Sequence, residues 1–407
     1  MRIAVYHNLS SGGAKRSLYE FTRRLARRHQ IDAYSLSCGE HEFADIRPFV
    51  NNTYITPFTP TRLFKRPFGR LNQISYLNDV FRLDRIDKSI AAQIDGEHYD
   101  IVFVHHCRYR QSPGLLRYLS TPSVYYCQEP PRKIYDPPIP RPYEANSQTT
   151  RRLNRFDPLP ALYLNTLKRV DRKNVASCNS ILVNSHHSHE NIWRVYGKRP
   201  VVCYLGVDSE EFKPLPCSKE NLVLAVGTLN PIKGYDLLVE GISRLPAQSR
   251  PALVIISNFA DSREKSFLDG MASELGVRLS VEPIINEPRE LAGWYSRAAV
   301  TGYTPVLEPL GLVALESMAC ETPVIGVREG GVRETVMDGC TGLLVERDPD
   351  DLADGLSYLL SHPDKAAEMG RRGRAWVQEK WTWDRSVGKV EAALMAVAGG
   401  ASKGENQ

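Results

Sequence analysis

The chain has 407 residues, enough for two domains, and its hydrophobic content of 42% supports ordinary buried cores. No apolar run approaches the ~20 residues that a membrane-spanning helix needs, and the eight cysteines are scattered without metal-binding spacing, which favours a reduced compartment such as the cytosol. Residues 1–200 hold 31 Lys and Arg against 17 Asp and Glu, and residues 201–407 hold 21 against 30. The first half therefore has a net charge of +14 and the second half one of −9. This asymmetry predicts an anionic partner for the first half, either a membrane surface or a phosphate-bearing acceptor. No motif for nucleic acid recognition accompanies this charge.

The chain begins with a predicted strand at residues 3–6, a tight loop at Gly12 and Gly13, and a helix over residues 14–28. Strand, glycine loop and helix are typical of the start of a doubly wound α/β unit. The two glycines let the backbone approach a ligand closely, although a plain turn fits them equally well. The helix carries six cations, which indicate either a solvated face or a surface for anionic lipid: Lys15, Arg16, Arg23, Arg24, Arg27 and Arg28.

Residues 62–70 mix Arg and Lys with Leu and Phe, a composition typical of an interfacial surface or of a loop flank packed against the fold. A buried parallel strand is predicted next, from Tyr99 to His106. Because ligands bind beyond the carboxyl ends of such strands, its terminal histidines are either active-site groups or satisfied structural residues.

Another strand is predicted at residues 124–128, followed by a segment rich in Pro and Arg over residues 130–160. We expect an irregular, mobile loop on the acceptor side there. Its arginines are candidates for an acceptor phosphate, with a simple spacer as the alternative: Arg141, Arg151, Arg152 and Arg155. A linker is predicted at residues 214–218, and a further strand at residues 222–227 leads to Thr228 and Lys233.

The most informative stretch is the pair Glu308 and Glu316, which flanks the start of an apolar helix predicted over residues 312–320. Free backbone N–H groups and the helix dipole near Gly311 favour an anion. An ionised carboxylate only accepts hydrogen bonds, so its natural partners are sugar hydroxyls. The pattern predicts a sugar nucleotide with phosphates at the helix start, Glu316 toward the ribose and Glu308 toward the transferred sugar. The alternative is a solvated loop glutamate and a helix-face glutamate.

Two further motifs follow this pair: Gly330-Gly331-Val-Arg-Glu334, and Asp338-Gly-Cys-Thr-Gly342-Leu-Leu. Together with Glu308…Glu316 they resemble the family-4 retaining glycosyltransferases of GT-B fold, strongly over residues 205–382 and more loosely in the first half. The segment 226–234 resembles the donor-phosphate loop of that family, with Lys233 at the phosphate-contacting position. Thr228 departs from the arginine usual there, and Arg328 and Arg333 are the candidates to replace that cation.

The resemblance implies an α/β protein with two Rossmann-like doubly wound domains facing across a cleft. We expect an acceptor-side domain over residues 1–205, a donor domain over 206–382, a helix over 383–397 that returns to the first domain, and a flexible tail over 398–407. Base contacts would come from the loop at residues 284–288.

The implied reaction moves a sugar from a nucleoside diphosphate sugar to a glycan or lipid acceptor, with retention of configuration. The acceptor would attack from the front face, the leaving phosphate would help to deprotonate it, and no metal or other cofactor is expected. The catalytic residues would be His105, Glu308 and Lys233. The residues expected at the donor are Gly12, Gly13, Gly227, Thr228, Lys233, Glu308, Leu310, Gly311, Leu312, Val313 and Glu316. The expected location is cytoplasmic, with peripheral binding to the inner face of the membrane.

Two alternatives stay open. A non-hydrolysing sugar-nucleotide epimerase shares this fold, and a non-catalytic subunit could keep the donor pocket while pairing with an active partner. The retained Glu308, Glu316, Lys233 and His105 argue against the second alternative, and Thr228 argues weakly for it. The sequence does not choose the sugar, the base, the acceptor or the oligomeric state.

Overall fold

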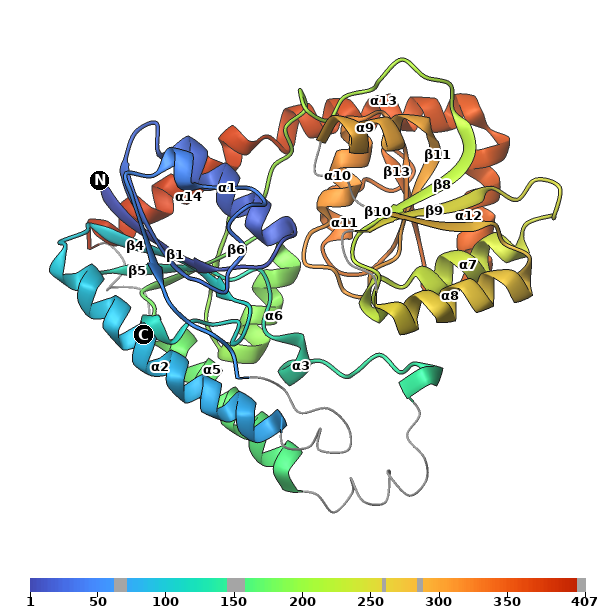
Figure 1. The fold of residues 1–407 in the computed structure, drawn as a ribbon. Helices are drawn as coiled ribbons and strands as arrows, with labels where there is room; N and C mark the ends of the chain where they lie inside the picture. Colours follow the sequence, from blue (N-terminus) through green and yellow to red (C-terminus); the bar gives the residue numbers. More distant parts are fainter. Residues whose placement is uncertain (62–71, 145–157, 258–260, 284–287, 401–407) are drawn as a thin grey trace.

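The computed structural model describes residues 1–61, 72–144, 158–257, 261–283 and 288–400. The chain forms two lobes, each built on a parallel sheet that is covered by helices (Figure 1). This arrangement confirms the expected α/β class. The described part of the chain contains no helix that is long and apolar enough to cross a membrane.

The first lobe holds a seven-stranded sheet in the order β3-β2-β1-β4-β5-β6-β7. The strands in the middle of this sheet are almost fully buried because a parallel sheet is covered on both faces. The strands are β1 (Arg2–Asn8), β2 (Gln30–Leu36), β3 (Asn52–Thr56), β4 (Ile101–Cys107), β5 (Ser123–Tyr126), β6 (Ser180–Val183) and β7 (Val201–Val202). The helices are α1 (Gly13–Leu25), α2 (Asn72–Gly96), α3 (Arg132–Tyr135), α5 (Pro158–Ala176) and α6 (His186–Tyr196), with short 3₁₀ turns η1 (Arg47–Phe49), η3 (Gly114–Arg117) and η4 (Pro142–Glu144).

The second lobe holds a six-stranded sheet in the order β10-β9-β8-β11-β12-β13. Its strands are β8 (Glu220–Val226), β9 (Ala252–Ser257), β10 (Leu279–Pro283), β11 (Ala298–Tyr303), β12 (Val324–Val327) and β13 (Gly342–Val345). Its helices are α7 (Tyr235–Arg244), α8 (Ser262–Leu275), α9 (Pro288–Arg297), α10 (Leu312–Ala319), α11 (Val332–Thr335), α12 (Pro349–Ser361) and α13 (Pro363–Lys380), with the turn η5 (Pro231–Lys233) after β8.

Chain order reverses at the same place in both sheets, beside β1 in the first and beside β8 in the second. Doubly wound sheets bind ligands outside the carboxyl ends of their strands at this point. The loop after β1 carries Gly12 and Gly13, and the loop after β8 carries Gly227 and Thr228. The topology therefore places both glycine loops at the two switch points.

The last helix, α14 (Trp383–Ala398), returns from the second lobe to the first (Figure 1). The ring of Trp383 meets that of Phe21 on α1 edge-on, with centroids 5.7 Å apart. Where the chain crosses between lobes, the N–H of Val207 donates to the carbonyl of Trp381 over 2.8 Å. This helix packs on α1, β4 and β5 of the first lobe, so the end of the chain joins the second lobe back to the first.

The cations near α1 pair with acidic groups of the second half. Arg23 and Arg24 lie 3.6 and 3.8 Å from the carboxylate of Asp208, and Arg28 lies 3.2 Å from that of Glu391 on α14. Arg23 and Arg24 are therefore held against acidic groups of the same chain, whereas the Arg28 side chain stays 75% exposed, and the lipid-facing surface expected on this helix stays a prediction. Part of the charge asymmetry between the halves is neutralised inside the chain.

Arg141 likewise points into the second lobe and is not available to an acceptor phosphate. Its guanidinium lies 2.9 Å from Glu264 and 2.8 Å from Asp236. The expected acceptor-phosphate contact at Arg141 is therefore wrong, because carboxylates of the same chain already occupy this side chain. The expectations for residues 62–70, for Arg151, Arg152 and Arg155, for residues 284–287 and for the tail beyond residue 400 lie outside the described residues.

Candidate functional site

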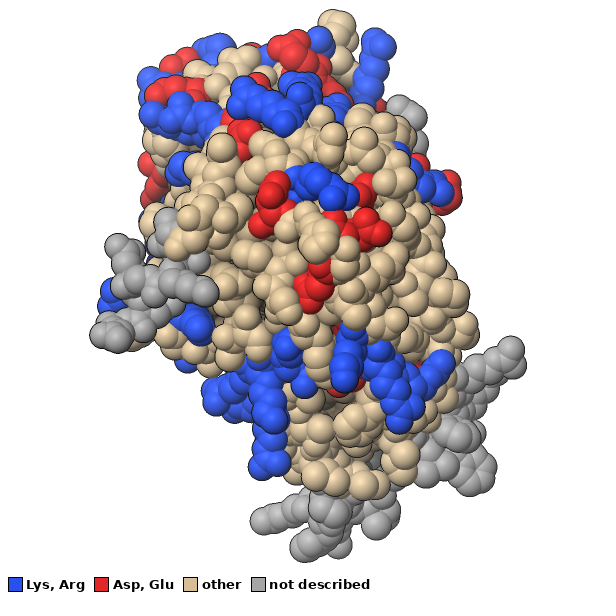
Figure 2. All heavy atoms as spheres, turned by 90° about the vertical axis from the view of Figure 1, so that its left-hand side faces the viewer, with Lys and Arg blue, Asp and Glu red and all other residues tan. Residues whose placement is uncertain are grey.

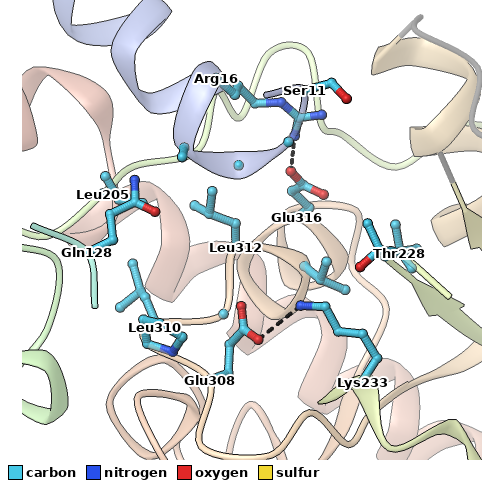
Figure 3. Close-up of a pocket in the computed structure, with 18 of the residues that line it drawn as sticks. Ser11, Arg16, Gln128, Leu205, Thr228, Lys233, Glu308, Leu310, Leu312 and Glu316 are labelled. Atoms are coloured by element: carbon cyan, nitrogen blue, oxygen red, sulfur yellow. Dashed lines mark hydrogen bonds and ion pairs between the residues drawn. The ribbon is translucent and has the colours of Figure 1, made fainter. Parts of the chain in front are cut away.

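A cavity of about 840 Å³ lies between the two lobes, bounded by the loops after β1, β5, β8 and β11 and by the start of α10. All eleven residues that the sequence assigned to the donor line it, from Gly12 in the first lobe to Glu316 in the second. Figure 3 shows their side chains converging from both lobes. A cavity of this size, with a few convergent polar groups, suits a small-molecule ligand.

Lys233 and Glu308 form an ion pair inside this cavity, with Nζ 3.0 Å from Oε2 (Figure 3). The turn that carries Lys233 is fixed by Gly234, which has φ +62° and lies so close to the second-lobe backbone that an added Cβ would meet the carbonyl oxygen of Thr304 at 2.4 Å. Asn230 caps the same turn, since its side chain accepts from the N–H of Ile232. Lys233 is thus held at the end of β8 by local backbone geometry.

The loop that carries Glu308 rests on the Gly330-Gly331 motif. The N–H of Gly331 donates to the carbonyl of Glu308 over 2.7 Å. A Cβ at Gly331 would lie 2.1 Å from the carbonyl oxygen of Pro309, so only glycine fits. The role of this motif is therefore to let two loops pack backbone to backbone beneath the ligand cavity.

The carboxylate of Glu308 stays ionised in this setting. Burial alone would raise its pKa, but Lys233 and then Arg132 outweigh burial and hold the pKa of Glu308 below its usual value. A permanently charged acceptor beside an ammonium is suited to receive hydrogen bonds from hydroxyl groups.

Glu316 lies one turn inside α10 and is 3% exposed. Its carboxylate accepts hydrogen bonds from Arg16 of the first lobe and, over 2.9 Å, from the hydroxyl of Tyr295. Burial raises the pKa of Glu316, and Arg16 and Tyr295 oppose that rise. Figure 3 shows Arg16 reaching across the cavity to this carboxylate. The contact occupies the oxygens that the sequence assigned to a ribose.

The glycine loop after β1 leaves room for a ligand directly opposite α10. Gly12 has φ +137°, a conformation that favours glycine, and a Cβ there would meet nothing within 4 Å. Gly13 approaches the first residue of α10, because its added Cβ would lie 3.5 Å from Cδ1 of Leu312. The starts of α1 and α10, where backbone N–H groups have no acceptor in their own helix, therefore both border this cavity, as suits an anionic ligand.

Arg132 is a cavity residue that the sequence did not single out. It lies on α3 of the first lobe, and its guanidinium donates over 2.8 Å to the carbonyl oxygens of Val306 and Leu307, just before Glu308. Its Nε also donates to Glu129 over 2.6 Å. Arg132 therefore fixes the Glu308 loop from across the cleft.

The two arginines that the sequence suggests as replacements for the cation missing at Thr228 lie elsewhere. Arg328 pairs with Asp338 at 2.6 Å, and Arg333 donates to the carbonyl of Gly330 over 3.2 Å; neither lines the cavity. The expectation that these two arginines compensate is therefore wrong in this geometry. Among the described residues, Arg16 and Arg132 are the arginines that line the cavity, and both come from the first lobe.

The structure does not bring His105 to the cavity lining. This side chain is 1% exposed, stacks on Tyr126 with ring centroids 5.7 Å apart, and leaves Nε2 without a hydrogen-bond partner. Burial lowers the pKa of His105 well below its ordinary value, with smaller effects from His106 and Lys15. Lys15, expected on a cationic face, is itself 1% exposed.

Within the described residues, no three His, Cys, Asp or Glu side chains are grouped as a metal site would require. Glu334 of the Gly-Gly-x-x-Glu motif instead accepts from the backbone N–H groups of His186 and His187, both over 2.9 Å, at the start of α6 in the first lobe. This motif therefore joins the lobes as well as supporting the Glu308 loop.

Comparison with known proteins agrees with this geometry. The family model described as Glycosyltransferase Family 4 matches residues 11–211, and the model described as Glycosyl transferases group 1 matches residues 207–376. The chain is 32% identical to a D-inositol 3-phosphate glycosyltransferase of Xylanimonas cellulosilytica, covering 56% of this chain and 58% of the relative. It is 33% identical to a GDP-mannose-dependent alpha-(1-6)-phosphatidylinositol monomannoside mannosyltransferase of Mycolicibacterium smegmatis, covering 47% and 54%. The chain thus spans little more than half the length of these curated relatives.

Solved structures show the same fold at lower identity. Sucrose-phosphate synthase from Thermosynechococcus elongatus superposes with a TM-score of 0.71 at 21% identity, covering 97% of this chain and 99% of that one. Anabaena HepE, solved with UDP and glucose, gives a TM-score of 0.66 at 17% identity, covering 97% and 100%. The two family models, which together run from residue 11 to residue 376, and these superpositions show that the chain belongs to the family-4-like glycosyltransferases of GT-B fold.

Proposed function

We propose that the protein transfers a glycosyl unit from a nucleoside diphosphate sugar to a hydroxyl group of a phosphate-bearing acceptor, with retention of configuration. The observation that carries this proposal is the Lys233–Glu308 pair at the start of α10, facing Gly12 and Gly13 across one cavity. Positive charge, free backbone N–H groups and a hydroxyl acceptor meet there, which are the groups that a sugar diphosphate needs.

In this proposal the diphosphate lies between the Gly12–Gly13 loop and the start of α10. Lys233 faces the phosphate that leaves with the nucleoside, where negative charge grows as the glycosidic bond breaks. Glu308 accepts hydrogen bonds from hydroxyls of the transferred sugar, and Glu316 accepts them from the ribose.

Arg16 takes a second role when the donor enters. Its guanidinium holds Glu316 in the structure, so a ribose that binds Glu316 displaces it. Arg16 belongs to the first turn of α1, three residues after Gly13, and its nearest anionic site is then the diphosphate. We therefore assign to Arg16 the positive charge that Thr228 does not supply.

Acceptor attack comes from the first lobe on the same face as the leaving phosphate. The leaving phosphate oxygen takes the acceptor proton, so the incoming oxygen replaces the departing one on one face and configuration is retained. The names of the relatives support a phosphate-bearing acceptor, since they specify inositol 3-phosphate and a phosphatidylinositol mannoside.

The test is a donor screen with UDP-, GDP- and ADP-sugars and with inositol phosphate as acceptor. We expect one donor class to release nucleoside diphosphate in equal amount with a glycosylated product whose anomeric configuration, measured by NMR, matches the donor. Conversion of the donor to another sugar nucleotide without diphosphate release would identify an epimerase. Nucleotide binding without turnover for every donor and acceptor would identify a non-catalytic subunit.

A further inference from the structure

Exposed large apolar side chains gather at the start of two helices of the first lobe. Phe81 on α2 and Leu162 on α5 are each 58% exposed. We call the following six side chains the helical tip; all are more than a third exposed and lie in the first turns of these helices: Ile74, Tyr76, Phe81, Leu159, Leu162 and Leu164. Exposed apolar groups scattered singly are ordinary, but a contiguous group marks an interaction surface.

The two helices run side by side in the same direction and project from the first lobe (Figure 1). The rings of Tyr76 and Tyr163 meet between them, with centroids 6.3 Å apart. The two helices therefore contact each other at the tip, and their exposed apolar side chains lie at the same end of the lobe.

Each helix changes from apolar to basic along one face. On α2, Ile74 and Phe81 are followed on the same stripe by Arg85 and Lys88, since separations of seven and four residues return to one helix face. At 1.5 Å per residue, Lys88 lies about 10 Å behind Phe81 along the axis.

Helix α5 repeats this order. Leu162 is followed on its stripe by Arg169 and Lys173, which lie about 10 and 16 Å further along the axis. We call the exposed cations of both helices the cationic collar: Arg85, Lys88, Arg169, Arg172 and Lys173. Figure 2 shows a band of Lys and Arg on the lower part of this side of the molecule, where Figure 1 places α2 and α5, with uncharged side chains directly beneath it.

No acidic group of these helix segments opposes the collar. Within residues 72–88, Asp79, Asp84 and Asp87 are bound by Arg82, Arg117 and Arg110 respectively. The acidic residue of α5, Asp171, is buried and accepts from Ser112, Tyr135 and Tyr196. The surface is thus apolar at its end and positive behind it.

We propose that the helical tip docks the first lobe on an anionic phospholipid surface, with the apolar residues entering the interface and the collar at the level of the lipid phosphates. Interfacial segments bury their apolar face about 5–10 Å into the boundary between headgroups and acyl chains. The spacing from the apolar residue to the first collar residue is about 6 Å from Phe81 to Arg85 and about 10 Å from Leu162 to Arg169, which falls within that depth. A second copy of the chain fits the pattern less well, because two collars would face each other with like charge.

This inference does not rest on the proposed function, because lipid binding is measured without donor or acceptor. It also assigns membrane binding to α2 and α5 and not to α1, where Lys15 is buried and Arg16, Arg23 and Arg24 pair within the chain.

The experiment is co-sedimentation of the full chain with phosphatidylcholine vesicles, with and without phosphatidylglycerol, at low and high salt. The tip variant is Phe81→Gln with Leu162→Gln, since glutamine is polar but keeps helix propensity. The collar variant is Arg85→Gln with Arg169→Gln. The matched controls are Met395→Gln on α14, where the methionine is 53% exposed, and Arg371→Gln with Arg372→Gln on α13, where both arginines are exposed. Circular dichroism checks that each variant is folded.

We expect the native chain and both controls to pellet with anionic vesicles at low salt and less at high salt. The collar variant should lose about fivefold in partitioning for each cation removed, and the tip variant should lose binding at either salt. Equal pelleting of native and tip variant, or no pelleting of the native chain, would overturn the proposal. If only the collar variant loses vesicle binding, the protein is held by charge attraction at the lipid surface and the tip does not insert. A concentration-dependent dimer that the tip variant abolishes would assign this surface to a second copy.

Discussion

Replacement of Glu316 by Gln tests the assignment of the ribose site. Glu316 is buried, accepts from Arg16 and Tyr295, and is the carboxylate that we assign to the ribose hydroxyls. The amide keeps the shape of the side chain and an oxygen acceptor but loses the charge. Hydrogen bonds to a charged acceptor contribute about 1.5–3 kcal/mol, against about 1 kcal/mol for a neutral one.

Competition from Arg16 reduces the effect that is measured. In the free protein Arg16 holds Glu316, so the ribose gains this carboxylate only by displacing a partly exposed ion pair, which is worth up to about 1 kcal/mol. The net loss in Glu316→Gln is therefore about 1–2 kcal/mol, or roughly five- to thirtyfold in the Kd of a nucleoside diphosphate.

Isothermal titration calorimetry with UDP, GDP and ADP measures this loss, and the same titration with the matching nucleoside should show a loss of similar size, because the ribose is common to both. Thermal unfolding controls for the fold, and we expect little change in Tm, since the variant removes a buried charge whose pKa burial raises. An unchanged nucleotide Kd in a folded Glu316→Gln protein would refute the ribose assignment.

Three further predictions use other residues of the cavity and its surroundings. Arg16→Gln should weaken binding of the nucleoside diphosphate, because the cation serves the phosphates, but not binding of the nucleoside, whose ribose no longer has to displace Arg16 from Glu316; equal losses for both ligands in calorimetry would show that Arg16 only positions Glu316. Lys233→Ala should lower kcat roughly a hundredfold and change the donor KM less, since the charge it meets grows in the transition state; initial rates across donor concentrations decide, and an intact kcat would leave Lys233 as a structural partner of Glu308. His105→Phe should make the free energy of unfolding fall less steeply below pH 6.5. Burial lowers the pKa of His105, so below pH 6.5 the unfolded chain binds a proton that the folded chain does not. This difference lowers the free energy of unfolding of the native protein by up to about 1.4 kcal/mol per pH unit. Urea unfolding between pH 5 and 7 measures that slope, a native-like slope would contradict it, and the transfer rate of the same variant tests the catalytic role that the sequence predicts for His105.

The donor side of the cavity could be predicted from sequence because its residues are close together in the chain. Glu308, Gly311 and Glu316 fall within nine residues, so helix geometry alone relates them. Lys233 follows β8 at a fixed turn, and Gly234 and Gly331 hold close backbone contacts that only glycine allows. These positions carry local signals that a single sequence displays.

Contacts across the cleft could not be predicted in this way. Arg16 and Glu316 are 300 residues apart, and Arg132 reaches Val306 over 174 residues. No local pattern distinguishes Arg16 from Arg23 or Arg24 on the same basic helix. Only the topology of the two sheets brings the loop after β1 to the start of α10.

The sequence did not predict helix α2, for a different reason. Its buried face contains polar side chains, including Asp79 and Asp87, while Ile74 and Phe81 are exposed. Asp87 accepts from the hydroxyl of Tyr6 over 3.1 Å and from the N–H of Gly114 over 3.0 Å. This exchange of polar and apolar faces erases the amphipathic pattern on which helix prediction relies, and it also leaves the apolar tip at the surface.

A crystal structure of the protein with a nucleoside diphosphate would show whether this ligand lies between the Gly12–Gly13 loop and the start of α10. We expect the ribose hydroxyls on Glu316, the diphosphate within reach of Lys233 and the Gly12–Gly13 backbone, and the Arg16 guanidinium moved from Glu316 to the phosphates. A nucleotide bound elsewhere, or one bound here while Arg16 still holds Glu316, would contradict the account.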